Sequence, residues 1–356
     1  MSTFQKFIQY YKPYKKVFIF DLICAAFISL VDLAYPQILR SLTKTLFLRD
    51  ASTILKTLPV IGGILFICYV FQAFCKYYVT YQGHMMGAKM ERDMRRKLFD
   101  HYENLSFSYY DQHNTGQMMS RLVSDLFDIS EAAHHGPENL FISLVKIVGS
   151  FIFLFIIQWK LAIILLAIVL LMIFFSAKQN RKMQATFLDN RRKIGDVNAS
   201  LQDSLAGIRI VQSFANEDIE REKFRVGNEA FLDSKRDNYR AMGSFQSGNT
   251  FFQGMMYLVT LLAGGYFIAL GQMSAADLAM YALYIGIFIS PIQILVELTE
   301  MIQKGMSGFI RYQSVIDIEP EITDCVDAVD MKHPDGDICY HDVSFSYEDN
   351  EIVLNN

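Results

Sequence analysis

Four ionisable side chains lie inside apolar runs of the sequence: Asp21, Asp32, Lys76 and Lys146. A charge in hydrocarbon is unfavourable unless it meets a partner or a water-filled cavity. At a rise of about 1.5 Å per residue, Asp21 and Lys146 fall at similar depths in the inner half of the bilayer. We hypothesise that Asp21 pairs with Lys146 or with Lys76; the alternative is that the lysines snorkel to the interface. Asp32 lies higher and would suit a water-filled cavity.

The remaining reactive side chains do not form a recognisable catalytic or metal site. None of the five cysteines forms a C-x-x-C pair, and His113, His134 and His135 lack a spacing that would partner them as ligands. Paired cysteines or spaced histidines are the usual signature of a structural zinc site. The sequence therefore predicts no catalytic residue, no metal and no disulfide framework.

The composition indicates a membrane protein. Hydrophobic residues make up 52% of the 356, and the mean hydropathy is +0.21, which soluble domains seldom reach without long apolar runs. The net charge is only −4, so no global field favours nucleic acid as a partner. The partner that this composition does predict is membrane lipid.

The apolar runs predict an all-α protein with six transmembrane helices. Each run is close to the roughly 20 residues that cross a bilayer. The N-terminal segment 1–16 is polar and aromatic, and we interpret it as a cytoplasmic interfacial segment before an uncleaved first span, not as a signal peptide. The predicted spans are residues 17–39, 58–79, 138–157, 161–177, 250–270 and 278–298.

Two long connections, 80–137 and 178–249, form predicted cytoplasmic arms. Both contain apolar residues at helical spacing, and proline is absent from their interiors, so we expect the membrane helices to continue into them. Lys and Arg are concentrated in the arms, and the positive-inside rule then places both chain ends in the cytoplasm. The connection Arg40–Thr57 also carries basic residues, which runs against this orientation.

The arms carry motifs in a characteristic order. The first holds Asp93–Ser106, then Tyr109-Tyr-Asp-Gln-His-Asn-Thr-Gly116, then Ser120-Arg121 and Asp125. The second holds Leu205-Ala-Gly207-Ile-Arg-Ile-Val211-Gln-Ser-Phe214-Ala-Asn-Glu217. After the last span come Arg311 and Val315-Ile-Asp317-Ile-Glu319-Pro320. Their order and spacing resemble ATP-binding cassette (ABC) exporters, with conservative departures at Asp203 and Ala276.

The resemblance implies a type-1 transmembrane domain of a half-transporter of the multidrug or lipid exporter kind. Residues 17–312 would form that domain, 313–335 a linker and 336–356 the short β-like start of a nucleotide-binding domain. In the family, an aromatic at the place of Tyr347 stacks on adenine, and the intact protein uses ATP and Mg. The phosphate loop G-x-x-x-x-G-K-[ST] is not in this sequence, so we expect no ATPase activity from the chain by itself.

The resemblance also implies partners. A second half-transporter subunit, identical or different, would complete the pathway, and nucleotide-binding domains in cis or in trans would drive alternating access. The expected location is a bacterial plasma membrane. The tips of the arms would press on the nucleotide-binding domains; the alternative is that the tips contact nothing. The implied coupling residues are Asp111, Gln112, His113, Asn114, Thr115 and Gly116 in the first arm, and Phe214, Ala215, Asn216, Glu217 and Asp218 in the second.

Other classes of function stay open at this point. The chain could be a permease subunit that uses a separate ATPase chain, or a non-functional fragment. A channel or receptor would not explain the motifs at the arm tips or the cassette-like tail. The Met- and aromatic-rich faces of the last two spans suit either a greasy substrate or helix packing; they comprise Met255, Met256, Phe267, Met280, Tyr281, Tyr284 and Phe288.

Overall fold

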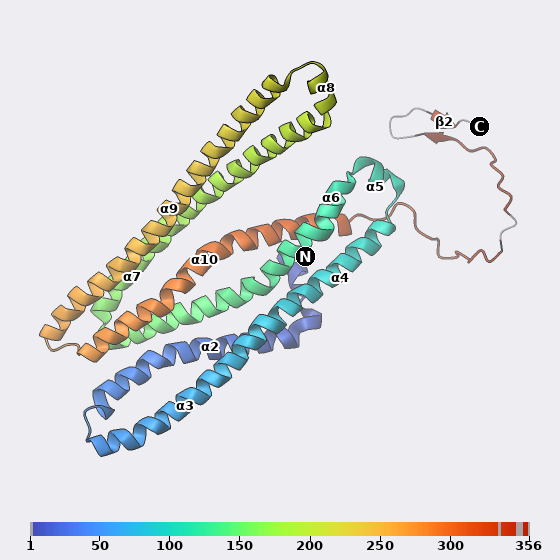
Figure 1. Cartoon of the computed structure of the whole chain (residues 1–356). Helices are drawn as coiled ribbons and strands as arrows, with labels where there is room; N and C mark the ends of the chain where they lie inside the picture. Colours follow the sequence, from blue (N-terminus) through green and yellow to red (C-terminus); the bar gives the residue numbers. More distant parts are fainter. Residues whose placement is uncertain (1–2, 334–335, 347–351, 355–356) are drawn as a thin grey trace.

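The computed structural model of the chain describes residues 3–333, 336–346 and 352–354, and these are almost entirely helical. A short helix α1 (Thr3–Gln9) and a 3-10 turn (Lys12–Tyr14) precede α2 (Lys15–Ser41). A π-helical turn, Leu42–Leu46, extends α2 beyond the predicted end of the first span. Figure 1 shows the long helices running side by side. The short loops that join them lie at one end of the molecule, and the two arm tips lie toward the other end.

The second span and the first arm form one helical run. Helix α3 (Ala51–Tyr78) passes through a π-helical turn (Val79–Gly83) directly into α4 (His84–Glu103). The arm tip consists of α5 (Phe107–Gln112) and α6 (Thr115–Ser120), and a third π-helical turn (Arg121–Asp125) leads back. This run is longer than a bilayer crossing requires. The second membrane helix therefore continues into the arm, as the sequence predicted.

Helix α7 (Leu126–Ala206) bends back on itself. Its backbone leaves the helical region at Gln158 (φ −152°, ψ 92°), where the sequence places the tight turn between two spans. The hydroxyl of Tyr281 donates to the carbonyl oxygens of Leu154 (2.7 Å) and Gln158 (2.8 Å), so the turn's exposed carbonyls have a partner. The two legs of α7 lie antiparallel in Figure 1.

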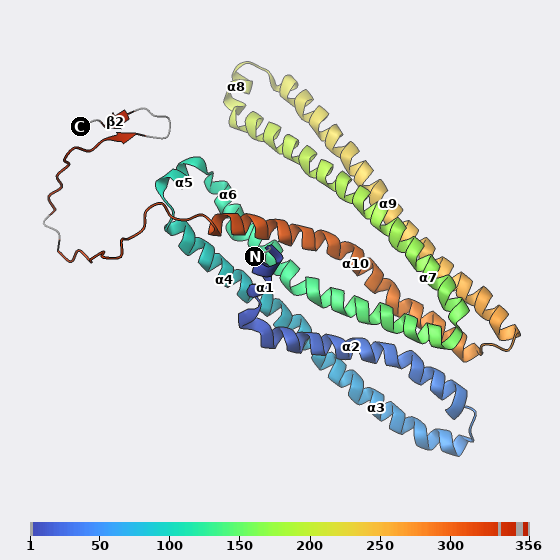
Figure 2. The ribbon, with the colours of Figure 1, turned by 180° about the vertical axis from the view of Figure 1, so that it is seen from behind.

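The second leg of α7 and helix α9 (Glu217–Ala269) form a long hairpin with α8 (Ile208–Ser213) at its tip. Helix α10 (Ala275–Ile316) runs back between this hairpin and the first arm. Figure 2, from behind, shows the same separation of the α7–α9 hairpin from the remaining helices toward the α8 tip. Both arm tips lie toward the same end of the molecule.

Within the described part of the chain, five helices are long and apolar enough to cross a membrane, and the third of these, Thr115–Ala206, contains the reversal at Gln158. They differ in how much of each apolar stretch the chain itself covers. The stretch in α10 is 44% buried, whereas that in α3 is 0% buried. An apolar helix with no protein cover needs lipid or another subunit around it, so the chain is an integral membrane protein.

The main core lies where α7, α9 and α10 meet. It includes the Met- and aromatic-rich faces of the last two spans, because Met256, Met280, Tyr281, Tyr284 and Phe288 are each at most 1% exposed. Those residues therefore serve helix packing, the second of the two predicted roles. After α10 the chain is extended, and β1 (Phe345–Ser346) pairs antiparallel with β2 (Ile352–Leu354), with Phe345 opposite Leu354.

Candidate functional site

The first arm tip is a tight turn between α5 and α6. Asn114 precedes α6, and its side-chain oxygen accepts a hydrogen bond of 2.7 Å from the N–H of Gly116, which caps the helix. His113 stacks on the ring of Tyr109 with centroids 4.0 Å apart. The predicted coupling residues Asp111–Gly116 occupy this turn, and all of them except the half-buried His113 are exposed.

An ion pair holds the base of this tip to the end of α10. Arg311 donates from Nε and Nη2 to the two carboxylate oxygens of Asp125, at 2.8 and 2.6 Å. The side chain of Asp125 is 8% exposed. Such a two-point contact fixes direction as well as distance. Small residues bring the backbones together here, since a Cβ on Gly308 would lie 3.0 Å from the carbonyl oxygen of Asp125.

A buried cluster surrounds that ion pair and includes the tip. It joins α4, α5, α6, the start of α7 and the end of α10, so movement of the tip must move α10 with it. Ser108 in α5 also donates a 3.0 Å hydrogen bond to Glu321, beyond α10. The members are Met94, Leu98, Tyr102, Leu105, Tyr109, Met118, Leu126, Ile129, Phe309, Tyr312 and Val315.

The N-terminal helix α1 covers the same cluster. Phe7 packs edge-to-face on Phe309 with centroids 5.2 Å apart, and Lys6 lies 2.9 Å from Asp317 at the end of α10. The hydrogen bonds from Lys6 and then Gln313 hold the pKa of the Asp317 carboxyl below its usual value. The segment predicted to be interfacial is therefore also a brace for α10.

The second arm tip is built differently. Helix α7 ends at Gly207, α8 follows, and Ala215 adopts a left-handed backbone (φ 52°) that turns the chain into α9. Three acidic residues, Glu217, Asp218 and Glu220, lie in the first turn of α9, where they complement the helix dipole. The predicted coupling residues 214–218 thus comprise the link from α8 to α9 and the first two residues of α9.

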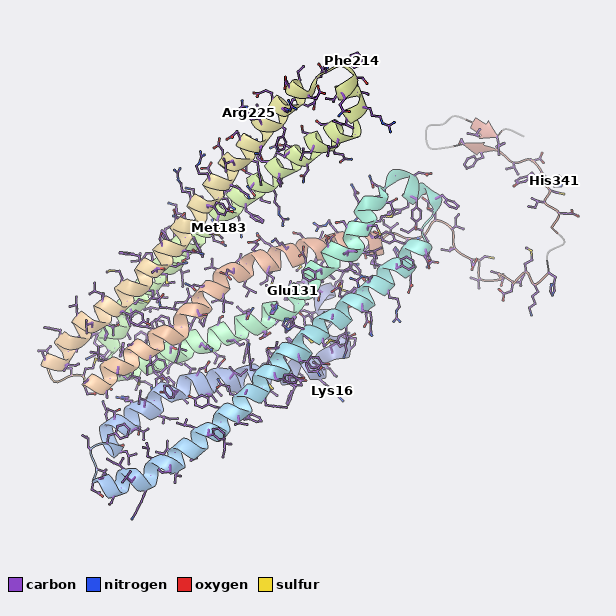
Figure 3. The ribbon with its side chains drawn as sticks, viewed as in Figure 1. Lys16, Glu131, Met183, Phe214, Arg225 and His341 are labelled. Carbon is purple, nitrogen blue, oxygen red and sulfur yellow. The ribbon has the colours of Figure 1, made fainter. Side chains whose placement is uncertain are left out.

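Apolar side chains at this second tip point to solvent. Phe214 is 73% exposed, Ile210 67% and Leu205 67%. Figure 3 shows Phe214 at the outer end of the hairpin, directed away from the other helices. Among the residues that the structure describes, the main helical contacts of α8 are with α7 and α9, the two helices that it connects. An exposed apolar group of this kind is typical of a surface that another protein covers.

The intramembrane charges pair differently from our hypothesis. Lys146 lies 2.6 Å from Asp32, and Gln72 donates a 2.8 Å hydrogen bond to the same carboxylate. The predicted Asp21–Lys146 pair is wrong. The depth estimate failed because α2 continues to Leu46, which places Asp32 and Lys146 at similar distances from the outer ends of their helices. Asp32 is thus a paired group.

Asp21 is buried near other ionisable groups but not bonded to them. It is 1% exposed, and its Oδ1 has no hydrogen-bond partner among the described residues. Glu138, Lys76 and His84 lie close enough to act on it electrostatically. The Lys76 side chain is exposed, so the alternative hypothesis of snorkelling suits Lys76 better than pairing does.

A second charged cluster lies at the end of the bundle away from the arm tips. Asp277 receives Arg40 Nε at 2.5 Å and Lys44 Nζ at 2.6 Å, and its side chain is 5% exposed. The backbone N–H of Ser274 donates to the same carboxylate at 3.0 Å. These contacts explain Arg40 and Lys44, two of the basic residues on the connection 40–57, where the orientation rule disfavours them. Sequence reasoning missed the cluster, although the Ser274-x-x-Asp277 spacing of a capping box was visible.

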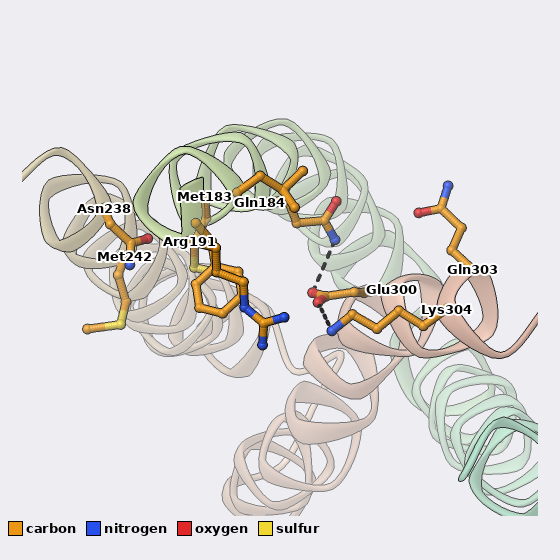
Figure 4. A pocket seen from close by; sticks show the side chains of 10 residues that line it. Met183, Gln184, Arg191, Asn238, Met242, Glu300, Gln303 and Lys304 are labelled. Carbon is orange, nitrogen blue, oxygen red and sulfur yellow. Dashed lines mark hydrogen bonds and ion pairs between the residues drawn. The ribbon is translucent and has the colours of Figure 1, made fainter. Parts of the chain in front are cut away.

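A pocket of about 470 Å³ lies between the α7–α9 hairpin and α10. Figure 4 shows the charged ends of Arg191, Glu300 and Lys304 entering it from both sides. Lys304 lies 2.6 Å from Glu300, which also accepts a 3.3 Å hydrogen bond from Gln184, whereas Arg191 lies against the ring of Phe187 at 5.0 Å. The lining also includes apolar side chains: Met183, Phe187, Leu188 and Met242.

ATP does not fit the residues that the structure describes. Tyr347, the predicted adenine-stacking residue, lies outside the described residues. The described residues 336–346 are exposed throughout, and the sequence holds no G-x-x-x-x-G-K-[ST] loop to cradle phosphates. We therefore derive no step through a nucleotide bound to this chain.

Three histidines form the group most suited to a metal. His84, His134 and His135 bring their ring nitrogens within 4.8 Å of one another. The sequence predicted no metal because the cluster joins helices far apart in the chain, and ligand spacing along one segment does not reveal it. His113, which was predicted to be a coupling residue, lies elsewhere and stacks on Tyr109.

Comparison with known proteins gives a consistent result. The family profile described as the ABC transporter transmembrane region matches residues 18–292. The chain is 38% identical over 352 residues to the "Uncharacterized ABC transporter ATP-binding protein YwjA" of Bacillus subtilis (strain 168). It is 22% identical over 355 residues to the "ATP-dependent lipid A-core flippase" of Syntrophus aciditrophicus (strain SB).

These alignments include nearly the whole chain but only part of each relative. They cover 99% and 100% of this chain, and 60% and 59% of the two relatives. The chain therefore spans about 60% of the length of these curated relatives. The activities that the names of these relatives state belong to those longer proteins.

Proposed function

We infer that this chain, which belongs to the family of ABC transporter transmembrane regions, forms one half of a membrane transport pathway. Two such subunits, identical or different, would enclose the pathway. The uncovered apolar stretch of α3, at 0% burial, and the 22% burial of the stretch in α9 support a second subunit and lipid as the missing cover. The plasma membrane is the proposed location, with both chain ends in the cytoplasm.

The second arm tip is the observation that carries this proposal. Phe214, at 73% exposure, and Ile210, at 67%, extend from a long hairpin that its own chain leaves uncovered at the tip. A stiff helical hairpin with an apolar end suits the transfer of displacement from a nucleotide-binding domain to the membrane. The nucleotide chemistry belongs to those domains, and the residues of this chain receive and transmit the movement.

The first arm tip would receive movement by a second route. The turn Asp111–Gly116 is open to a partner, while the base of the tip is joined to α10 through Asp125 and Arg311. Because α10 also lines the pocket at Glu300 and Lys304, displacement at the tip would alter the pocket. Alternating access is the transport mechanism that we propose on this basis.

The pocket supports an amphipathic substrate. Methionine and aromatic side chains adapt to varied apolar groups, and Arg191 offers positive charge to an anionic head group, whereas Lys304 is paired with Glu300. One relative is named as a flippase of a lipid, lipid A-core. We propose that lipid-like molecules with an anionic head group contact this pocket.

The test compares transport and ATP hydrolysis in proteoliposomes. The complete transporter, with its nucleotide-binding domains, is reconstituted as wild type, as Phe214→Ala and as Phe224→Ala. Phe224 is a matched control because it lies on the same hairpin, 41% exposed, away from the tip. We expect Phe214→Ala to lower transport per ATP hydrolysed by roughly tenfold, about 1.4 kcal/mol of coupling, and Phe224→Ala to leave that ratio unchanged. Equal ratios in all three proteins would contradict the proposed role of the tip.

A further inference from the structure

A cluster of three histidines lies at the junction between the second span and the first arm. His84 begins α4 directly after the π-helical turn Val79–Gly83, and His134 and His135 lie on the first leg of α7. The ring centroids are 4.5 to 4.9 Å apart. Single π-helical turns inside long helices occur often at functional sites. The position of the cluster beside such a turn indicates a role other than helix packing.

The central histidine is buried with its polar atoms unused. His134 is 3% exposed, and neither ring nitrogen makes a hydrogen bond among the described residues. Buried polar groups are nearly always hydrogen-bonded. The unpartnered ring of His134 therefore suggests a bound group that the described residues do not supply. Its position is fixed by packing, because a Cβ on Gly83 would lie 2.1 Å from Cε1 of His134.

The atoms around the three rings favour metal coordination. Nδ1 of His84 lies 2.6 Å from the carbonyl oxygen of Thr80. A carbonyl only accepts, so Nδ1 carries the proton and Nε2 presents a lone pair. Metal-binding histidines usually donate their second nitrogen to a backbone carbonyl or a carboxylate in this way.

At the other two rings, a carboxylate lies beside one ring nitrogen, as the Thr80 carbonyl does at His84. Nε2 of His134 lies 3.5 Å from Glu138, and Nε2 of His135 lies 3.7 Å from Glu131. The carboxyl group of Asp21, which is 1% exposed, lies in the same buried region.

We propose that His84, His134 and His135 bind a divalent first-row transition-metal ion, with water completing the coordination. Imidazole ligands suit zinc, copper, iron and nickel ions. In a tetrahedral zinc site with Zn–N distances of about 2.0–2.1 Å, ligand nitrogens lie about 3.4 Å apart. The three ring nitrogens lie within 4.8 Å of one another, and closing to that spacing requires the exposed His84 and the half-buried His135 to rotate toward His134.

The ion would tie the first arm to α7. His84 is exposed, so an ion has access from the surface, while the buried His134 anchors the other side. A bound ion would hold α4 against α7 at the point where the long helix Ala51–Glu103 passes from span to arm. This role is separate from the proposed transport function and does not depend on it.

The experiment measures metal binding directly. The full protein is purified without a polyhistidine tag, reconstituted in nanodiscs and treated with EDTA. It is then titrated with Co²⁺, whose visible absorption reports nitrogen ligands, and with Zn²⁺ in competition. The variants are His84→Ala, His134→Ala and His135→Ala. The matched control is His333→Ala, because His333 is an exposed histidine outside the cluster.

We expect one ion per chain in wild type and in His333→Ala, and an affinity at least roughly 100-fold weaker in each cluster variant. Glu138→Gln should weaken binding roughly 10- to 100-fold, as loss of an outer-shell partner does. Equal binding in wild type and the cluster variants, or loss of binding in His333→Ala, would overturn the proposal.

A second measurement needs no substitution and so does not depend on how the variants fold. Diethyl pyrocarbonate modifies accessible histidines, and mass spectrometry locates the modified sites. We expect Zn²⁺ to protect His84 and His135 at least fivefold and to leave His333 unprotected. Modification of His84 at the same rate with and without Zn²⁺ would contradict the site.

Discussion

The two arm tips differ in what holds them. The first tip is part of a buried cluster, with Tyr109 only 7% exposed, and Arg311 joins its base to α10. The second tip extends on a long hairpin with Phe214 73% exposed. Among the described residues, the main helical contacts of this tip are with α7 and α9, the helices that it connects. The first tip is anchored to the rest of its own chain, although Phe107 on it is 86% exposed, whereas the second tip presents its apolar surface at the end of the hairpin.

The difference assigns the tips different parts in transmission. The first tip packs against the end of α10, and the same helix carries Glu300 and Lys304 in the wall of the pocket, so movement of the tip moves that wall. In the described part of the chain the second tip is not packed against α10, so it can transmit displacement to the membrane only when a partner protein binds to it. Substitutions at the first tip should therefore change folding stability as well as function, whereas substitutions at the second should change function alone.

The largest expected effect comes from breaking the ion pair at the first tip. Arg311→Ala leaves the carboxylate of Asp125, 8% exposed, without its two hydrogen bonds. We expect a loss of about 2 kcal/mol in the free energy of unfolding, because an unpaired buried charge is unfavourable. Thermal unfolding in detergent measures it. Arg225→Ala is the control, since its pair with Glu222 is exposed and should contribute almost nothing; equal losses would refute the distinction.

A smaller effect should follow from separating the two helices that the ion pair joins. A Cβ on Gly305 would lie 2.2 Å from Cβ of Ala132 and 2.8 Å from the carbonyl oxygen of Asp128. Gly305→Ala should destabilise by about 1–2 kcal/mol, because overpacking outweighs the gain in helix propensity. Gly254→Ala, where nothing lies within 4 Å, should be neutral or stabilising. Unfolding midpoints that move together would contradict this.

At the second tip we expect almost no change in stability. Phe214→Ala removes a side chain that is 73% exposed, so the free energy of unfolding should stay within about 0.5 kcal/mol of wild type. The same thermal unfolding assay applies. Destabilisation comparable to that of Arg311→Ala would show that the second tip is packed on its own chain after all.

The smallest effect concerns the brace from α1. The hydrogen bond from Lys6 lowers the pKa of Asp317, so this carboxylate stabilises the fold above its unfolded pKa, and that contribution is lost as the pH falls through the lowered value. Asp317→Asn should therefore lower the unfolding temperature slightly at pH 7, and the difference from wild type should shrink below about pH 4. A difference that grew on acidification would have the wrong sign.

The sequence predicted the helices and their turns well because periodicity and apolar length are local properties. The reversal near Gln158 and the helical run through both arms follow from residues close together in the chain. The motifs also drew attention to Asp125 and Arg311, but separately. Nothing local shows that these two residues meet, since helix packing decides which faces come together.

The intramembrane groups show the limit more sharply. The sequence identified Asp21, Asp32 and Lys146 as unusual, yet it paired Lys146 with the wrong carboxylate. The error was one of helix length, because the π-helical turn Leu42–Leu46 extends α2 and changes the level at which Asp32 lies. The histidine cluster was missed for the same reason as the ion pair, since His84 and His134 come together only through packing.

Hydrogen–deuterium exchange of the two tips tests the central claim most directly. The chain in nanodiscs is measured before and after a nucleotide-binding domain is added. We predict slow exchange in residues 107–125 in both states, and fast exchange in residues 205–219 that slows at least tenfold on addition. Equal exchange of the two tips in the chain alone, or no slowing at the second tip, would contradict the account.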